Sequence, residues 1–153
     1  VLNIFSRNND YIVSGPVWEY FRASKQMMNK DLPKYGFEDY LLRRKLIVNP
    51  EVDGLLREVI LDKANGFVGR TVIHPSHVIY VNALQAVTKE EYTDAVNILQ
   101  SEKDGVFKGE SGNKMNEVKP HTSWASKIYM RGRAYGVIEN ESSYISLFSP
   151  ALD

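Results

Sequence analysis

The stretch Gly66–Asn82, GFVGRTVIHPSHVIYVN, most constrains what this chain can fold into. A helix pattern runs into its first residue, a glycine, which can adopt the left-handed conformation that often ends a helix. The β-rich run Phe67–Ile73 follows, and Pro75 stops it because proline has no N–H for a strand ladder. A second helix pattern begins at Val78. This order of helix, strand, polar loop and helix is typical of parallel α/β proteins, which bind ligands at the carboxyl ends of their strands.

Upstream of that stretch, the sequence predicts a strand, a long connection and a helix. Tyr11–Ser14 is a β-branched and aromatic run typical of a buried strand, and a Gly-Pro pair ends it. Residues 22–49 have no clear period and are interpreted as an insertion or crossover. Pro50–Asn65 is predicted to be a helix with Asp53 as its N-cap. Its apolar face has helical spacing and comprises Leu55, Leu56, Val59, Ile60 and Ala64.

Downstream, the pattern predicts three helices and a tail without a sustained period. The first is Val78–Val87. Thr88 and Glu91 then have the spacing of a capping box, which starts the next helix. Its predicted buried face is Tyr92, Ala95, Val96 and Leu99. Pro120–Tyr135 is the last predicted helix, with Trp124, Ala125, Ile128 and Tyr135 directed inward.

The composition excludes several classes of partner. The 153 residues include 19 Lys+Arg and 19 Asp+Glu, so the formal net charge is zero. A neutral chain has no global field to attract nucleic acid or an anionic membrane. The absence of cysteine excludes disulfides and thiolate chemistry, and it fits a cytoplasmic location. No apolar run approaches the roughly 20 residues of a membrane helix, so we expect no nucleic-acid and no membrane partner.

The number of predicted strands points to a larger assembly of strands. Two parallel strands can neither bury both faces nor hide their edges. The chain also begins within an apolar pattern, residues 1–7, that is typical of the end of a helix. We therefore expect these residues to be about the last quarter of a larger parallel α/β barrel.

The central stretch resembles the eighth strand of the citrate lyase β-subunit / HpcH–HpaI aldolase superfamily. That pattern is G-F-x-G-[KR]-x-x-I-H-P-[ST]-[QH] followed by a V-N helix, and here it reads GFVGRTVIHPSH with Val81-Asn82 after it. Downstream, the superfamily's helix, glycine-rich hairpin and G-x-M-[IV]-D-x-P segment resemble Thr88–Leu99, Gly105–Gly112 and Asn113–Glu117. The segments SGPVWEYF, NGFVGRTVIHPSHV and NKMNEVKPH are closer still to bacterial carbon–carbon bond lyase-like proteins of tellurite-resistance and stress gene clusters.

The resemblance implies a TIM (β/α)8 barrel, of which this chain would form the C-terminal portion. Residues 1–87 would be about the last two βα units, and residues 88–153 a helical C-terminal extension that contacts a neighbouring subunit of a trimer or hexamer. The implied activity is that of a Mg²⁺-dependent carbon–carbon lyase acting on an oxo-acid or a CoA thioester. The alternative is a non-catalytic assembly or regulatory protein that retains the barrel.

The resemblance also implies where the metal is held. Its ligands, a Glu and an Asp at strand ends, would lie upstream of residue 1. We therefore expect no metal ligand in this chain, and we expect the chain alone to be inactive. One catalytic candidate remains, Glu117, which matches an acid that in many members reaches a neighbouring subunit's active site as an acid/base. This glutamate stands where the superfamily usually has aspartate, and its alternative role is to start the following helix near the positive end.

Five further residues are candidates for substrate binding, and four of them have a structural alternative. His74 and Ser76 lie in the polar loop, where the alternative is that the imidazole satisfies backbone groups of the turn and the serine caps the next helix. His77 replaces a glutamine of the superfamily, and both side chains donate and accept hydrogen bonds. Arg70 replaces the usual lysine and is either an anion contact or a surface residue. Trp18 follows the first strand and either lines a ligand site or packs in the core.

Overall fold

The computed structural model describes residues 2–5, 11–21, 42–43, 47–101, 106–108 and 115–148. These residues belong to two compact units, the first formed by residues 1–85 with 141–153 and the second by residues 86–140. Most of the predicted insertion, namely residues 22–41 and 44–46, lies outside the described residues. The predicted division into barrel units (1–87) and extension (88–153) stays a prediction.

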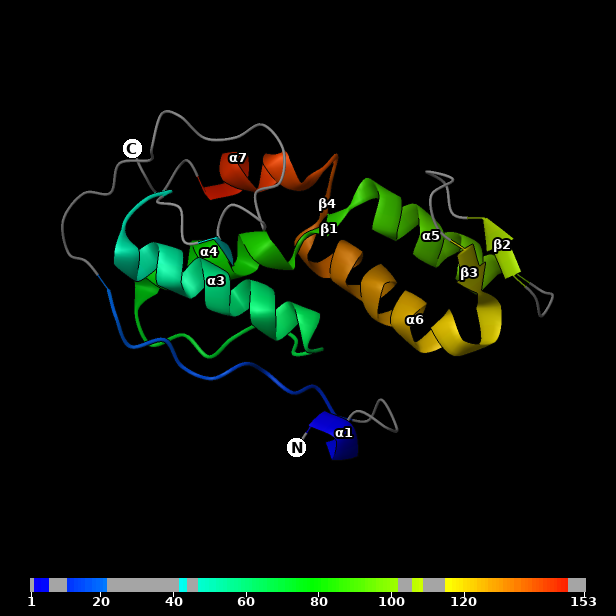
Figure 1. Ribbon diagram of the computed structural model, residues 1–153, viewed down its shortest axis with the longest axis horizontal. Coiled ribbons are helices and arrows are strands. Elements are labelled where there is room, and N and C mark those ends of the chain that lie inside the picture. Colours follow the sequence, from blue (N-terminus) through cyan, green and yellow to red (C-terminus); the bar gives the residue numbers. More distant parts are fainter. Residues whose placement is uncertain are drawn as a thin grey trace. The chain divides into compact units, whose positions relative to one another are not determined.

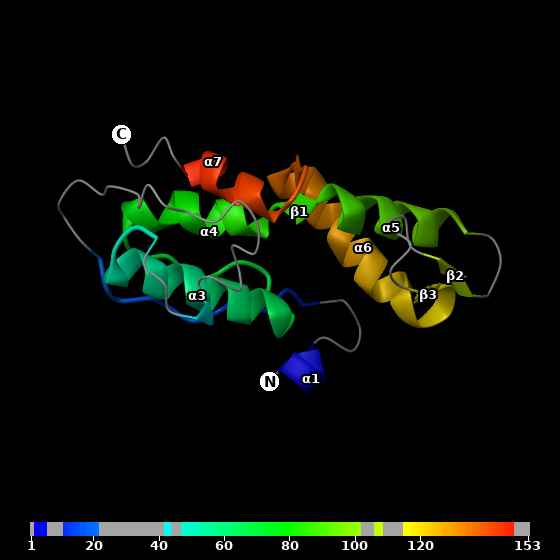
Figure 2. The ribbon, with the colours of Figure 1, turned by 45° about the horizontal axis from the view of Figure 1, so that its top comes forward.

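The first unit is built from helices around a small parallel pairing. Two helices, α3 (Pro50–Ala64) and α4 (Val78–Gln85), lie side by side, and α7 (Tyr144–Phe148) packs beside α4 (Figure 1, Figure 2). The described residues of this unit also include three short elements: α1 (Leu2–Phe5), η1 (Pro75–His77) and η2 (Glu141–Ser143). Its core is formed by fully buried side chains, among them Ile47, Val52, Leu55, Leu56, Tyr80, Leu84 and Tyr144.

Helix α3 begins at a different residue from the one predicted. Its N-cap is Asn49, whose Oδ1 accepts a hydrogen bond from the Val52 N–H at 3.0 Å, and proline occupies the first helical position. Asp53 is not the cap. Its buried carboxylate accepts the N–H groups of Ile47 and Val48, at 2.8 and 2.9 Å, and so fixes the chain that enters the helix. The predicted apolar face is confirmed except at its end, where Ala64 is exposed.

The two predicted strands of the first unit do pair, and the pairing is parallel. Gly15 and Arg70 form a parallel bridge, and three backbone hydrogen bonds of 2.9–3.0 Å support it: Val68 N to Val13 O, Gly15 N to Gly69 O, and Thr71 N to Gly15 O. The prediction of full strands was wrong in extent, because this single bridge replaces a longer ladder. Gly69 has φ +69°, and a left-handed residue interrupts the extended conformation that a ladder needs.

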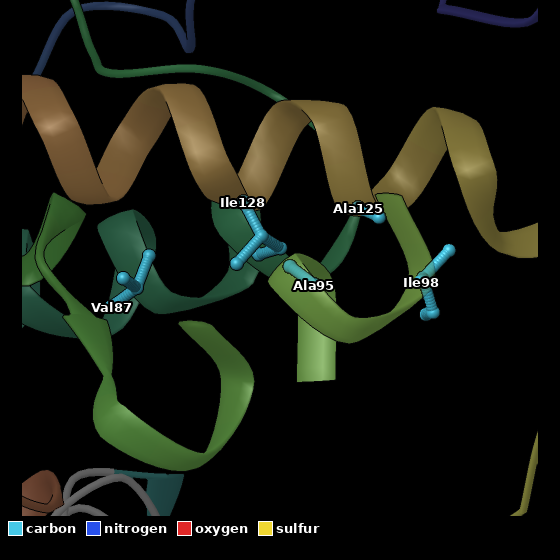
Figure 3. Close-up of a cluster of buried hydrophobic side chains, with 5 residues drawn as sticks. All are labelled: Val87, Ala95, Ile98, Ala125 and Ile128. Carbon is cyan, nitrogen blue, oxygen red and sulfur yellow. The ribbon is translucent and has the colours of Figure 1, made fainter. Parts of the chain in front are cut away.

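The second unit is a helical hairpin with a short strand pair near each end. Its helices are α5 (Lys89–Gln100) and α6 (Val118–Tyr135), which lie side by side (Figure 1, Figure 2). Strands β1 (Val87–Thr88) and β4 (Val137–Ile138) pair in parallel, and β2 (Val106–Lys108) and β3 (Met115–Glu117) pair antiparallel. Figure 3 shows the core between the helices, formed by Val87, Ala95, Ile98, Ala125 and Ile128.

The capping box of α5 is confirmed. The Thr88 hydroxyl accepts the Glu91 N–H at 3.3 Å, and the Glu91 carboxylate accepts the Thr88 N–H at 3.0 Å. The buried face of this helix is rotated from the predicted one: Asp94, Ala95 and Ile98 are buried, whereas Leu99 is 39% exposed. In α6, Ala125 and Ile128 are buried as predicted, and Tyr135 is exposed instead.

The chain returns to the first unit after β4. The tail had no sustained period, yet Tyr144 is fully buried, and Lys63 Nζ donates a hydrogen bond to its hydroxyl at 2.9 Å. This contact joins α7 to α3 within the first unit. As for membranes, none of the helices in the described part of the chain is both long and apolar enough to cross one.

Candidate functional site

The loops that leave the parallel pairing meet at its carboxyl end. Residues 16–21 follow the first segment, and residues 71–77 follow the second. The Phe21 ring stacks on the His74 ring with centroids 4.1 Å apart and planes within 13°. Ser14 and Thr71 also approach each other, with 3.5 Å between their hydroxyl oxygens. The polar loop and the first loop therefore form one cluster, in the position where parallel α/β proteins bind ligands.

His74 forms the turn that starts η1 and α4. It is the N-cap of η1, and its Nδ1 accepts the Ser76 N–H at 3.3 Å. The same Nδ1 lies 2.8 Å from the Ser76 hydroxyl oxygen. The structural alternative for His74, that its imidazole satisfies a backbone group of the turn, is therefore observed. The cap of η1 is His74 and not Ser76, whose hydroxyl bonds to His74 instead. This role does not exclude a substrate contact, because this bonding occupies only one ring nitrogen of His74.

His77 is buried behind this turn. Only 2% of the residue is exposed, and its ring centroid lies 5.6 Å from that of His74. Burial lowers the pKa of His77 below its ordinary value, and the nearby His74 lowers it further, while a hydrogen bond to the backbone of Tyr20 opposes this shift. His77 is therefore neutral at pH 7, and it connects the polar loop to the first loop.

We expect the change His77→Gln to reduce the pH dependence of stability on the acid side of neutrality. An unfolded histidine takes up a proton near pH 6.5, whereas folded His77 has a lowered pKa. Below pH 6.5 the unfolded state therefore binds more protons, and stability falls as the pH falls toward the folded pKa. Urea unfolding at several pH values between about 7 and 5 measures this. Equal slopes for the variant and the parent chain would contradict the assignment.

Trp18 holds the first loop against α3. Its Nε1 donates a hydrogen bond to the Glu51 carbonyl at 2.9 Å, and its ring lies against Gly54, where any Cβ would overlap it. The Tyr20 ring contacts the Trp18 ring edge-on, with 5.2 Å between the ring centroids. The packing role that the sequence left open is thus observed. Substrate binding by Trp18 stays a prediction.

Arg70 is directed toward α3. Its guanidinium forms ion pairs with Asp62 at 2.5 Å and Glu58 at 3.4 Å, and 2% of its side chain is exposed. Burial raises the pKa of Asp62, and Arg70 opposes that shift. Gly15 allows this arrangement, because a Cβ there would overlap the Asp62 carboxylate. Arg70 is neither a surface residue nor aligned with the His74 loop, so its predicted anion contact with substrate gains no support.

Asp62 is a partner that the sequence interpretation missed. It is not part of the apolar face predicted for this helix, but it is buried. The signal was the opposite charge of Asp62 and Arg70 on either side of the glycine turn that ends α3. Phe21 was also missed as a site residue, because helical or strand periodicity says nothing about which loops meet.

The opposite face of the pairing is exposed. Ser14 and Thr71 share this face, and the two-residue period of extended chain places Ile12 and Ile73 with them. Ile12 is 80% exposed and Ile73 is 64% exposed. Two large apolar side chains on an exposed face are unusual for a parallel pairing, because parallel sheets are normally buried on both faces.

The catalytic candidate Glu117 lies in the second unit. It is the last residue of β3, and its backbone pairs with that of Val106. The structure describes the backbone of this residue, so the acid/base role of its carboxylate stays a prediction. For a metal, the described residues include no group of three or more His, Cys, Asp and Glu side chains that could hold one.

Comparison with protein families gives one match that covers most of the chain. The family model described as a carbon–carbon bond lyase of the TIM-barrel fold matches residues 1–137. Comparison with curated proteins and with solved structures gives no significant match. The matched range includes the parallel pairing, both loops at its carboxyl end, and the helical hairpin of the second unit.

Proposed function

The chain belongs to the carbon–carbon bond lyase family of the TIM-barrel fold, and we propose that it forms part of a lyase that cleaves a bond next to a carboxylate. The observation that carries this proposal is the cluster at the carboxyl end of the parallel pairing, where the Phe21–His74 stack joins two successive loops. Active sites of TIM barrels are built from such loops. The proposed substrate is an oxo-acid or a CoA thioester, the classes implied by the resemblance to the citrate lyase β-subunit superfamily.

We also propose that further barrel strands cover the exposed face of Ile12, Ser14, Thr71 and Ile73. Parallel sheets are buried on both faces, and within the described part of the chain α3 lies against one face while Ile12 and Ile73 are exposed on the other. A preceding segment of the same gene product is the proposed source of these strands. Assembly into a trimer or hexamer through residues 88–153 is a proposal from the resemblance, and light scattering on the purified protein tests it.

If the lyase uses Mg²⁺, residues outside the described part of the chain must bind it. The described residues do not fit a metal centre, because no sufficient cluster of ligands exists among them. The carboxylates for Mg²⁺ would have to come from outside the described part of the chain, and we derive no step through the metal.

A second function, a non-catalytic assembly or regulatory protein, is favoured by one observation. The Arg70 guanidinium forms ion pairs with Asp62 and Glu58 of α3. This cation is therefore paired within the fold and is not held for a substrate anion.

Turnover by the complete gene product distinguishes the two functions. We would assay cleavage of a panel of oxo-acids and CoA thioesters, with Mg²⁺ and with EDTA, by the release of the smaller product. Phe21→Ala removes the stacking contact between the loops, and we expect it to lower turnover about 10²-fold because reacting groups tolerate little displacement. The matched control is Lys89→Ala, because its ion pair with Glu139 is exposed and lies in the second unit.

Two results would count against the lyase. Absence of cleavage across both substrate classes would favour the assembly or regulatory protein. Equal turnover of the Phe21→Ala variant and the Lys89→Ala control would exclude the His74 cluster as the reacting site.

A further inference from the structure

The imidazole of His74 is held in one orientation and one tautomer. Its Nδ1 accepts the Ser76 N–H, and because a backbone N–H can only donate, Nδ1 carries no proton. The Ser76 hydroxyl, 2.8 Å away, then donates to the same nitrogen. In the neutral ring the proton must therefore be on Nε2. The Phe21 stack on the ring face restricts rotation of the imidazole.

The Nε2–H of His74 has no partner within the described part of the chain. Both protein hydrogen bonds of the ring are made by Ser76 at the other nitrogen. The neighbouring ring, His77, lies 5.6 Å away between centroids, and burial keeps it neutral. The cluster thus presents an oriented N–H donor at the loops that follow the parallel pairing.

We propose that His74 Nε2–H donates a hydrogen bond to the substrate oxygen that gains negative charge, the oxo or carboxylate oxygen of an oxo-acid. This inference rests on the proposed lyase function. The proton stays on Nε2 throughout, because Nδ1 is held as an acceptor and cannot take up a second proton without breaking both bonds to Ser76. His74 is therefore an oxyanion donor and not a general acid. A donor oriented before the reaction stabilises developing charge without reorganising.

Two variants separate this role from the turn-forming role. His74→Asn keeps a side-chain oxygen that can cap the turn and lacks the Nε2–H donor. We expect it to lower kcat about 10²- to 10³-fold, as for loss of one oxyanion donor, while KM changes by less than about threefold. Ser76→Ala leaves its own backbone N–H on Nδ1, so we expect a smaller loss of kcat. A purely structural role predicts that His74→Asn retains the parent kcat.

The tautomer of His74 can be measured without an assay of lyase activity. Nitrogen-15 NMR of the histidine rings in the full chain, with the His74→Asn spectrum for assignment among the three histidines, should show His74 protonated on Nε2. Addition of oxalate, a planar dianion that mimics the enolate of an oxo-acid, should shift the Nε2 resonance. An Nδ1–H tautomer, or an Nε2 resonance unmoved by oxalate, would overturn the inference even in an active lyase. If an inactive protein shows the Nε2–H tautomer and the oxalate shift, then His74 binds a carboxylate ligand through Nε2–H, whereas the lyase function and the oxyanion role both fail.

Discussion

Replacement of Asp62 by alanine is expected to lower the free energy of unfolding of the first unit by about 3–5 kcal/mol. The Arg70 guanidinium is nearly inaccessible to solvent, and Asp62 is its closer carboxylate. Removal of that carboxylate leaves a buried cation with only the more distant Glu58, which is itself 44% exposed at the side chain. The charge can neither recover its hydration nor find an equivalent partner, so the folded state loses stability.

Tryptophan fluorescence can report this change in the first unit alone. The chain has two tryptophans, Trp18 in the first unit and Trp124 in the second. In a Trp124→Phe background, the emission of Trp18, which packs on α3, follows denaturant unfolding of the first unit. The matched control Glu58→Ala removes the exposed partner and should cost about 1 kcal/mol or less.

A double replacement tests whether the unpaired charge causes the loss. Asp62→Leu combined with Arg70→Met removes both charges, and it should recover most of the stability lost in Asp62→Ala, because apolar pairs often replace buried ion pairs at little cost. A double variant as unstable as Asp62→Ala would show that the loss comes from packing and not from charge.

Replacement of Tyr144 by alanine is expected to cost about 3–5 kcal/mol, the usual range for an aromatic side chain removed from a core. Tyr144 is fully buried beside α4, and its hydroxyl accepts a hydrogen bond from Lys63 on α3. Truncation would leave a cavity beside α4 and break the hydrogen bond that joins α7 to α3. The same Trp18 fluorescence assay measures the loss.

Two controls assign the effect to the ring. Tyr144→Phe keeps the ring and loses the hydroxyl, so it should cost about 1 kcal/mol. Leu147→Ala alters a partly exposed residue of the same helix, 39% exposed, and should cost about 1 kcal/mol or less. If Tyr144→Ala were no more harmful than Leu147→Ala, then α7 would contribute little to the first unit.

Local rules predicted the helices well. The apolar spacing of α3, the capping box at Thr88 and the proline that begins η1 each act within a few residues, so sequence distance is a good guide to spatial distance. The parallel relation of the two short strand segments was also predictable, because the intervening chain includes a helix long enough for a crossover. The resemblance placed the chain in a carbon–carbon lyase family, and the family match confirms that coarser assignment.

The candidate site could be predicted only in part. The polar loop at His74 and its position after a strand followed from the sequence, but its stacking with Phe21 did not. That contact joins residues more than 50 positions apart, through a connection with no clear pattern. The sequence did not reveal which residues contact Arg70 and Trp18. In the structure, α3 supplies a partner for both side chains, Asp62 for Arg70 and the Glu51 carbonyl for Trp18.

What the residue pattern alone determined is the type and order of the elements, because helix periodicity, capping and proline effects are local. Tertiary structure alone decided which side chains are used up by the fold and which remain available. Asp62 is buried because Arg70 reaches it past Gly15, and Tyr144 is buried because α7 returns to the first unit. For His74, the turn uses Nδ1, and Nε2 has no hydrogen-bond partner among the described residues. Such outcomes depend on contacts between residues that are far apart in the sequence, and these contacts cannot be inferred from any short stretch of it.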